Sequence, residues 1–434
     1  MKNTYKNKQF ISGSFLGFIF LFFLVVFVEW FQNLLNVNLF SGLKYAISLI
    51  LFTIFWLFFS RKILIVKNYF LLIFLLIVFS ILNVSSITPW INQLLGFILT
   101  FSFLFIFLMA YSINIREHHI HDGIKNLIFI ILILSIFPIL SLFTSGESSL
   151  RELSINSIGN YSWNFFRELG AYGLILNVGL ILALSKLLND KYVIWLNIAI
   201  IFTIFIFITG LKKSMLEAAL IWSIFIIISG SLQLRLASIF FLVIVFPIIL
   251  TVMSQQILYD LQVNLNYLND VGSDGHVRLA MYLSSFSIAL ENFPLGSGMG
   301  SFGSTASIFN YYSPLYFDYG IDKIGSNGPE FINSDQGSTI LDTFWPHILG
   351  EMGFIGLMIF ILLFFYPSYS SAKLLFSNKD SSIVSLCFIT FLVPIVIGID
   401  GLALYTPEVP MFILFHSGLV GFCLRIVNTK NLKL

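Results

Sequence analysis

The chain of 434 residues is 58% hydrophobic and only 10% charged, with 50 phenylalanines. An ordinary soluble domain carries about 25% charged residues, so this chain has too little polar surface to cover a globule in water. The composition therefore predicts an all-α polytopic membrane protein and excludes a soluble one. The net charge of +2 is too small to indicate a nucleic-acid partner. Cys387 and Cys423 lie in apolar runs and indicate neither a disulfide framework nor a thiolate metal site.

Apolar runs of about 20 residues, long enough for a helix to cross a bilayer, recur along the whole chain. The first is too long for a signal peptide and lacks a small-residue cleavage pattern, so we interpret it as a retained span. The sequence thus predicts one polytopic domain over 1–434. Its twelve expected spans lie near 10–29, 43–59, 64–83, 91–113, 126–143, 168–186, 192–209, 214–230, 236–254, 347–366, 382–400 and 409–425.

Most of the 23 lysines and arginines fall on one side of these spans, together with both termini. Because cytoplasmic segments are enriched in Lys and Arg, we expect both termini to be cytoplasmic and the long loop at 255–346 to be extracytoplasmic. The basic residues left on the outer side are Lys44, Arg151, Arg167, Lys212, Lys213, Arg278 and Lys323.

Several of these outer cations lie at or near helix ends rather than in the middle of a loop. Each could be neutralised by a nearby carboxylate, as Arg167 by Glu168 or Lys213 by Glu217 one turn on. Taken together, the set of Arg167, Lys212, Lys213 and Arg278 is better explained by an anionic ligand on the outer face.

The long loop contains an ordered piece between about 275 and 302. The pattern predicts a helix from about 275 to 291 that lies along the membrane surface and is stopped by Pro294, because the residue before proline avoids the α region. A run of alternating glycines follows at once, namely Gly296, Gly298 and Gly300. Glycines at these positions permit tight turns and let backbone N–H groups approach a ligand. The following 303–340 region is polar and aromatic, which suits either sugar rings or an ordered loop cap.

The tenth expected span opens with Trp345-Pro346-His347, and proline is well suited to a first helical turn. His347 and Glu351 are four residues apart, so they should share one helix face at the outer membrane surface. The pair could serve catalysis or simply fill a polar helix end. Of the other polar residues in the spans, Asp400 is expected at the interface and His416 in a polar contact between helices. The histidines at 118, 119 and 121 are interpreted as a solvated cytoplasmic loop.

Two of these pieces resemble the bacterial O-antigen polymerase and O-antigen ligase superfamily (Wzy-like and WaaL-like proteins). Two shorter pieces, 167–170 and 209–214, are similar to the family's Arg-x-x-Gly entry and Thr-x-Ser-Arg-Gly segment. The chain departs from the family where Ile348 follows His347 in place of asparagine, and where Lys212 and Lys213 replace arginine. The main similarity lies in Arg278, Tyr282, Asn292-x-Pro294-x-Gly296-x-Gly298-x-Gly300-x-Phe302 and His347-x3-Glu351-x-Gly353-x2-Gly356.

The resemblance implies a GT-C-like membrane glycosyltransferase in the bacterial cytoplasmic (inner) membrane, acting on the extracytoplasmic face. Its donor and acceptor would be undecaprenyl-diphosphate-linked oligosaccharides, with a chain-length regulator as a further candidate partner and no metal or cofactor. The catalytic candidates are His347, Arg278 and Glu351. The loop candidates for substrate binding are Tyr282, Gly296, Gly298 and Gly300, and those for the diphosphate are Arg167, Lys212, Lys213 and Arg278.

The residues support this chemistry in their own right. A diphosphate leaving group needs cations to stabilise the charge that builds as the glycosidic bond breaks, and an acceptor hydroxyl needs a base such as His347. A polymerase is favoured over a ligase that transfers glycan to lipid A-core or protein, because the loop is long and the His-Asn pair is missing. A transporter or flippase is the alternative from another class, but it should show repeat symmetry and ionisable residues at the bilayer midplane.

Overall fold

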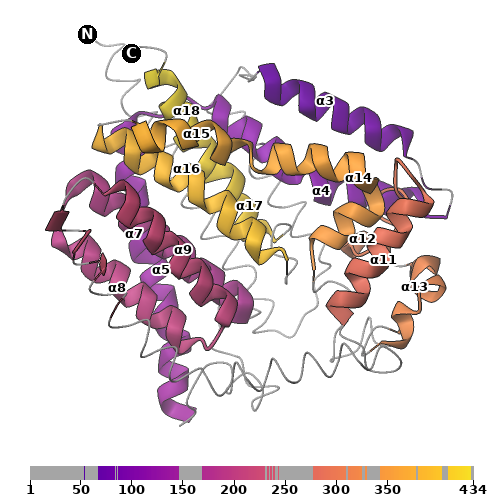
Figure 1. Ribbon diagram of the computed structural model, residues 1–434, viewed down its shortest axis with the longest axis horizontal. Coiled ribbons are helices and arrows are strands. Elements are labelled where there is room, and N and C mark those ends of the chain that lie inside the picture. The colour runs from indigo at the N-terminus through magenta and orange to yellow at the C-terminus, as the bar shows by residue number, and fades with distance from the viewer. Residues whose placement is uncertain are drawn as a thin grey trace.

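The computed structural model is built from helices, and no strand occurs in the part of the chain that it describes (Figure 1). The described residues are 53, 67–83, 85, 87–145, 169–229, 232–233, 235–236, 238–239, 243, 277–308, 311–324, 328–329, 343–377, 380–402 and 409–431. In the first half the helices are α3 (Lys67–Leu82), α4 (Trp90–Ser112), α5 (Glu117–Ser145), α7 (Leu169–Asp190), α8 (Val193–Ile208) and α9 (Lys212–Ile228).

The second half begins with short helices inside the polar stretch 255–346 and ends with a group of longer helices. The first set comprises α11 (Val277–Glu291), α12 (Thr305–Ile308), α13 (Pro314–Asp318) and a 3₁₀ turn, Ile321–Lys323. The second set comprises α14 (Trp345–Phe364), α15 (Tyr366–Ser377), α16 (Ser381–Asp400), α17 (Pro410–Ile413), a π-helical segment (Leu414–Leu419) and α18 (Val420–Asn431).

The chain is a helical membrane protein. Among the described residues, 6 helices are long and apolar enough to cross a bilayer: Trp90–Ser112, Glu117–Leu140, Leu169–Asp190, Trp345–Phe364, Ser381–Asp400 and Met411–Lys430. The expected spans from 64–83 to 214–230, and from 347–366 to 409–425, coincide with helices. Those near 10–29, 43–59 and 236–254 lie wholly or almost wholly outside the described residues. Helix α15 was not expected, because its sequence is short and rich in serine.

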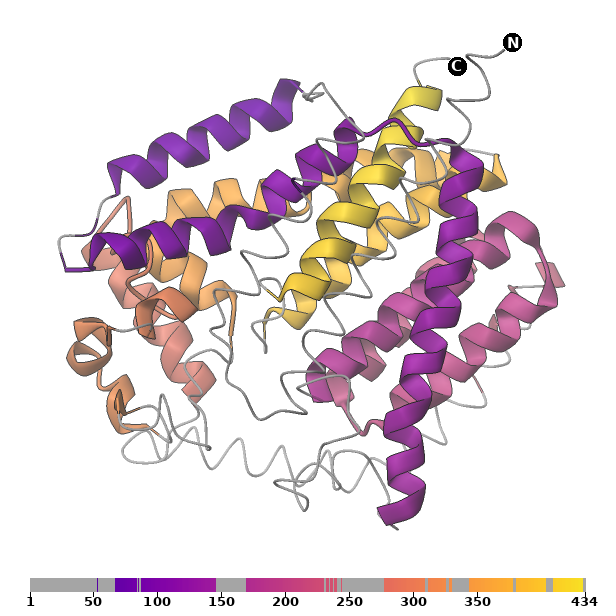
Figure 2. The ribbon, with the colours of Figure 1, turned by 180° about the vertical axis from the view of Figure 1, so that it is seen from behind.

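Helix α7 is the central element of one half of the molecule. It packs against α5, α8, α9 and α16, and nearly all of its side chains are buried. In the other half α14 lies beside α3 and α11, while α4 packs on the π-helical segment and α18 (Figure 2). Since α16 also contacts α15 and α18, the C-terminal helices join the two halves.

Segments expected on one side of the membrane meet at one end of α16. At its start, Asp380 caps the helix by accepting from the Ser382 backbone N–H at 3.0 Å. Lys430, near the end of α18, lies 2.6 Å from Glu117 at the start of α5. At the far end of α16, the Phe344 N–H donates to the carbonyl of Gly401 at 3.0 Å. Glu117, Asp380 and Lys430 therefore lie together at one end of α16, and Phe344 lies at the other.

Candidate functional site

Helix α14 is kinked at Gly353, where φ is 65° and ψ is −172°. This backbone region is essentially restricted to glycine. The kink lies beside two carbonyls of the preceding turn that bind the glycine-rich loop. The Ser297 N–H donates to the Gly350 carbonyl at 2.9 Å, and the Gly298 N–H donates to the Glu351 carbonyl at 3.0 Å. Two motif pieces that are about fifty residues apart in sequence are thus joined through their backbones.

The glycine loop, defined here as residues 296–303, lies in the protein interior between α4 and α14. Gly296, Gly298 and Gly300 all have positive φ values, of 76°, 94° and 73°. A Cβ atom added to Gly96 of α4 would lie 2.7 Å from the backbone nitrogen of Gly300, so no side chain fits between them. In the structure these glycines serve close backbone packing, and their expected contact with a ligand stays a prediction.

Two asparagines from the first half of the chain stabilise the contact between the glycine loop and α14 by hydrogen bonds. The side-chain amide of Asn83 donates to the Glu351 carbonyl at 2.7 Å and also to the carbonyl of Leu295. The amide of Asn92 donates to the Ala306 carbonyl at 2.6 Å. Neither asparagine was among the residues expected at the site, although a polar side chain at the edge of an apolar run was the available signal. Asn83 adds a second donor to the Glu351 carbonyl, which also accepts from the Gly298 N–H.

His347 and Glu351 lie together beneath the loop, and neither side chain has any exposed area. The Glu351 carboxylate accepts from the Phe302 N–H at 3.1 Å and from the Ser304 hydroxyl at 2.8 Å. Nδ1 of His347 lies 3.3 Å from that carboxylate and 3.2 Å from the Phe302 carbonyl. Both neighbours are acceptors, so Nδ1 carries the proton. Nε2 faces the Thr100 hydroxyl at 3.2 Å, and in the neutral imidazole it carries the lone pair.

The expected pairing of His347 with Glu351 is therefore present, and the pair is enclosed by protein. The four-residue spacing does put both side chains on one face of α14. That face is covered by α4 and by the glycine loop, because the kink at Gly353 lets the loop approach the helix closely. The four-residue spacing of His347 and Glu351 could not predict their burial, since it does not show which elements pack on that face of the helix.

The Lys213 ammonium is paired with the carboxylate of Asp400, which is fully buried at the end of α16. Sequence proximity had suggested Glu217 as the partner of Lys213, and the structure corrects that expectation. Glu217 is buried too, and one of its oxygens accepts from the Asn177 amide at 2.7 Å. The packing of α16 against α9 brings Asp400 to Lys213, and this tertiary contact leaves no trace in local sequence.

Tyr282 connects α11 to the same end of α16. Its hydroxyl donates to the Leu402 carbonyl at 2.9 Å. Partial burial raises the pKa of Tyr282 to about 12, and the nearby Arg278 guanidinium opposes that shift. Arg278 itself is half-buried in the first turn of α11.

Three of the motif pieces therefore contact one short turn, residues 400–402. The piece at 209–214 reaches it through the Lys213–Asp400 ion pair. The opening of α14 reaches it through Phe344 and Gly401, and α11 reaches it through Tyr282 and Leu402. Lys212 begins α9 beside its neighbour Lys213, whereas Arg167 lies outside the described residues.

Of the aromatic residues expected to face sugar or to cap the loop, Tyr316 is a loop cap. Its hydroxyl accepts from the Gly303 N–H at 2.7 Å and lies 2.5 Å from the Ser307 hydroxyl. Burial raises the pKa of this phenol, so it stays neutral. Elsewhere, His416 makes the expected contact between helices, with Nε2 3.2 Å from the Phe364 carbonyl. His121 packs toward α16, with Nε2 2.9 Å from the Ser382 hydroxyl, rather than into a solvated loop.

Comparison with known proteins does not assign the chain to a family. No protein-family model matches the chain, and no curated protein matches it either. The resemblance drawn from the motifs therefore rests on the residues themselves, and the function inferred from it is a proposal.

Proposed function

We propose that this chain is a surface-polysaccharide polymerase of the O-antigen type, which joins oligosaccharide repeat units carried on undecaprenyl diphosphate. On this proposal it has about 12 spans with a GT-C-like architecture, sits in the bacterial inner membrane with both termini cytoplasmic, and works on the extracytoplasmic face. The observation that carries the proposal is the convergence of the motif pieces. The Lys213, Tyr282 and Phe344 segments, far apart in sequence, all contact residues 400–402.

The reaction joins two lipid-linked sugars. A hydroxyl oxygen of the acceptor attacks the anomeric carbon of the donor with inversion, the bond from that carbon to the diphosphate oxygen breaks, and lipid diphosphate leaves with the electron pair. The hydroxyl proton must pass to a base. Negative charge grows on the diphosphate as the bond breaks, so fixed cations accelerate the step. Arg278, Lys212 and Lys213 are the described cations assigned to this task, and Arg167 is the fourth.

Asp400 supports this assignment by its position. The Lys213 side chain is 24% exposed while its partner Asp400 is fully buried, so the ion pair fixes the ammonium at the boundary of the protein interior. The ion pair therefore orients the lysine while its side chain remains partly accessible to an anion. The Asp400 carboxylate neutralises the charge of Lys213, so Lys213 attracts an anion less strongly than an unneutralised cation would. We therefore assign Lys213 to orienting the diphosphate and Arg278 to binding it most strongly, because a guanidinium can bind a phosphate through two hydrogen bonds.

His347 and Glu351 are assigned to the same reaction through the glycine loop. Together they hold Phe302 and Ser304, and hence the end of the loop, in one conformation. If His347 also takes the proton of the acceptor hydroxyl, Nε2 is the nitrogen that would do so, with the hydroxyl in the place of Thr100. The positioning role needs no rearrangement and is therefore the primary assignment.

The test is a cell-surface polysaccharide gel from a deletion strain complemented with wild type, Arg278→Ala or Lys323→Ala, each checked for expression. Lys323 is an exposed cation of the same stretch that makes a matched control. The proposal expects a single repeat unit on lipid core in the deletion strain, and a ladder restored by wild type and Lys323→Ala but not by Arg278→Ala. A ladder with Arg278→Ala would remove the core of the proposal.

Purified protein separates the other classes by product. With a defined lipid-linked repeat as both donor and acceptor, a polymerase yields a dimeric repeat and free lipid diphosphate. A ligase yields product only when lipid A-core or protein is the acceptor. Transport of the lipid-linked sugar in proteoliposomes with no new glycosidic bond would identify a flippase instead.

A further inference from the structure

Helix α11 buries serines and exposes large apolar side chains. Leu283, Phe286 and Leu290 are 58%, 50% and 54% exposed, whereas Ser284 and Ser285 are 7% and 0% exposed. An amphipathic helix on the surface of a water-soluble protein has the opposite arrangement, with its apolar side chains inward. The inversion indicates that something other than water covers the outer face of α11.

The exposed residues form one stripe along the helix. Leu283, Phe286 and Leu290 are spaced three and four residues apart, which places them on a single face. Phe293, in the turn that follows, continues the stripe and is 67% exposed. The opposite face carries Met281, Ile288 and other side chains that pack under the glycine loop. We call the set of Leu283, Phe286, Leu290 and Phe293 the α11 stripe.

The stripe is continuous with the outer face of a helix that crosses the membrane. Helix α11 packs along α14 (Figures 1 and 2). The ring of Phe286 meets the ring of Phe354 of α14 edge-on, with centroids 5.4 Å apart. Further along α14, Met358 and Leu362 are exposed in the same manner. Since α14 is a candidate span, its exposed apolar side chains face hydrocarbon, and the stripe extends that surface.

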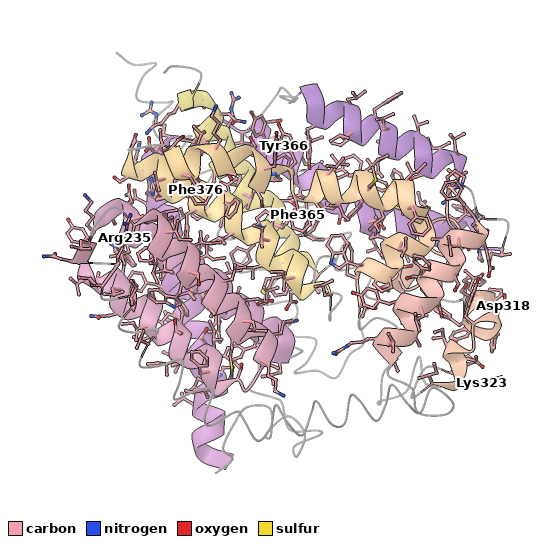
Figure 3. All side chains as sticks on the ribbon, in the orientation of Figure 1. Arg235, Asp318, Lys323, Phe365, Tyr366 and Phe376 are labelled. Atoms are coloured by element: carbon pink, nitrogen blue, oxygen red, sulfur yellow. The ribbon has the colours of Figure 1, made fainter. Side chains whose placement is uncertain are left out.

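The polar groups of this region lie on a different edge of α11. Glu291 accepts a hydrogen bond from the Tyr319 hydroxyl at 2.7 Å. Tyr319 directly follows α13, and Asp318 and Lys323 are exposed in the same short segment, at one rim of the molecule (Figure 3). The segment therefore has a polar edge suited to water and an apolar stripe suited to lipid.

The length of α11 limits how it can meet the bilayer. Its 15 residues rise about 22 Å at about 1.5 Å per residue, which is less than the roughly 30 Å thickness of the hydrocarbon core. The helix is therefore too short to cross the bilayer. We propose that α11 is embedded in the bilayer with the α11 stripe against lipid acyl chains, although it belongs to the polar stretch between two spans.

The proposal is tested with single cysteines in protein reconstituted into phosphatidylcholine vesicles. The two native cysteines are buried, and unsubstituted protein measures their residual labelling. Phe286→Cys and Leu290→Cys probe the stripe, Asp318→Cys is the water-exposed control, and Ser285→Cys is the buried control on the same helix. Each variant is treated with a membrane-impermeant maleimide. In parallel it is labelled in detergent with the fluorophore NBD, reconstituted, and quenched by lipids that carry a nitroxide on the acyl chain.

We expect the stripe cysteines to react with the impermeant reagent at least tenfold more slowly than Asp318→Cys, and their NBD labels to be strongly quenched by the nitroxide lipids. Equal maleimide reactivity at Phe286→Cys, Leu290→Cys and Asp318→Cys would overturn the proposal. Protection from maleimide without quenching by lipid would overturn it as well, because a protein rather than lipid would then cover the stripe. These readouts do not depend on enzymatic activity, so they stand apart from the proposed function.

Discussion

Replacement of Gly353 by alanine should unfold the junction between α14 and the glycine loop. The residue has φ 65° and ψ −172°, a conformation that costs a non-glycine residue about 1–3 kcal/mol. The new Cβ would also lie 2.6 Å from the Pro294 carbonyl oxygen and 2.8 Å from the Gly296 nitrogen. To relieve these contacts the loop must move away from Gly350 and Glu351, which weakens two backbone hydrogen bonds worth about 1 kcal/mol each. The sum is about 3–5 kcal/mol.

Gly320→Ala is the matched control for this substitution. Gly320 has φ 67° and ψ 18°, but no atom lies within 4 Å of a Cβ built there. It therefore isolates the cost of a left-handed backbone, about 1–2 kcal/mol. Reduced freedom of the unfolded chain offsets about 0.4–1 kcal/mol of that cost. Gly353→Ala should then destabilise the protein several times more than Gly320→Ala.

The assay is unfolding of both variants and wild type in detergent micelles, followed by tryptophan fluorescence and by labelling of the buried cysteines. We expect a small drop in the midpoint for Gly320→Ala and a large one, with loss of polymerising activity, for Gly353→Ala. Equal midpoints for the two variants would refute the reasoning, because they would mean that the loop does not press on the kink.

Three further outcomes follow from the site. Lys213→Ala removes the ammonium that pairs with the buried Asp400 carboxylate and should cost about 3–5 kcal/mol. Lys213→Met with Asp400→Leu should recover much of that loss in a double-mutant cycle of unfolding midpoints. Glu351→Ala removes the acceptor for Ser304 and Phe302, so thermal stability and activity should fall together; lost activity at wild-type stability would argue for direct catalysis instead. Tyr282 is stabilised in its neutral form, since its pKa is raised to about 12, so its contribution to stability is complete below pH 10 and is lost as the pH rises toward 12. Tyr282→Phe should reduce the alkaline loss by the Tyr282 contribution and leave the pH profile unchanged below pH 10, as measured by unfolding against pH.

The long apolar helices among the described residues, and the helix α11 within the polar stretch, follow from local sequence. Apolar runs of membrane-spanning length and the stop at Pro294 gave bounds close to those observed, since both signals act over one or two turns. The same is true of the shared face of His347 and Glu351, which depends only on helical periodicity. Their burial was not expected, because periodicity defines a face but not what packs on it.

Tertiary packing decided everything that requires two distant segments. The partner of Lys213 is Asp400 and not Glu217, because a carboxylate on a packed helix can be closer than one on the next turn. The burial of His347 and Glu351 depends on the kink at Gly353 and on the glycine loop that fits against it. Sequence alone thus determined the membrane class, the long apolar helices and the candidate site residues. Which of those residues meet, and which are enclosed, was set by contacts between helices, since those contacts depend on three-dimensional complementarity that no single stretch of sequence contains.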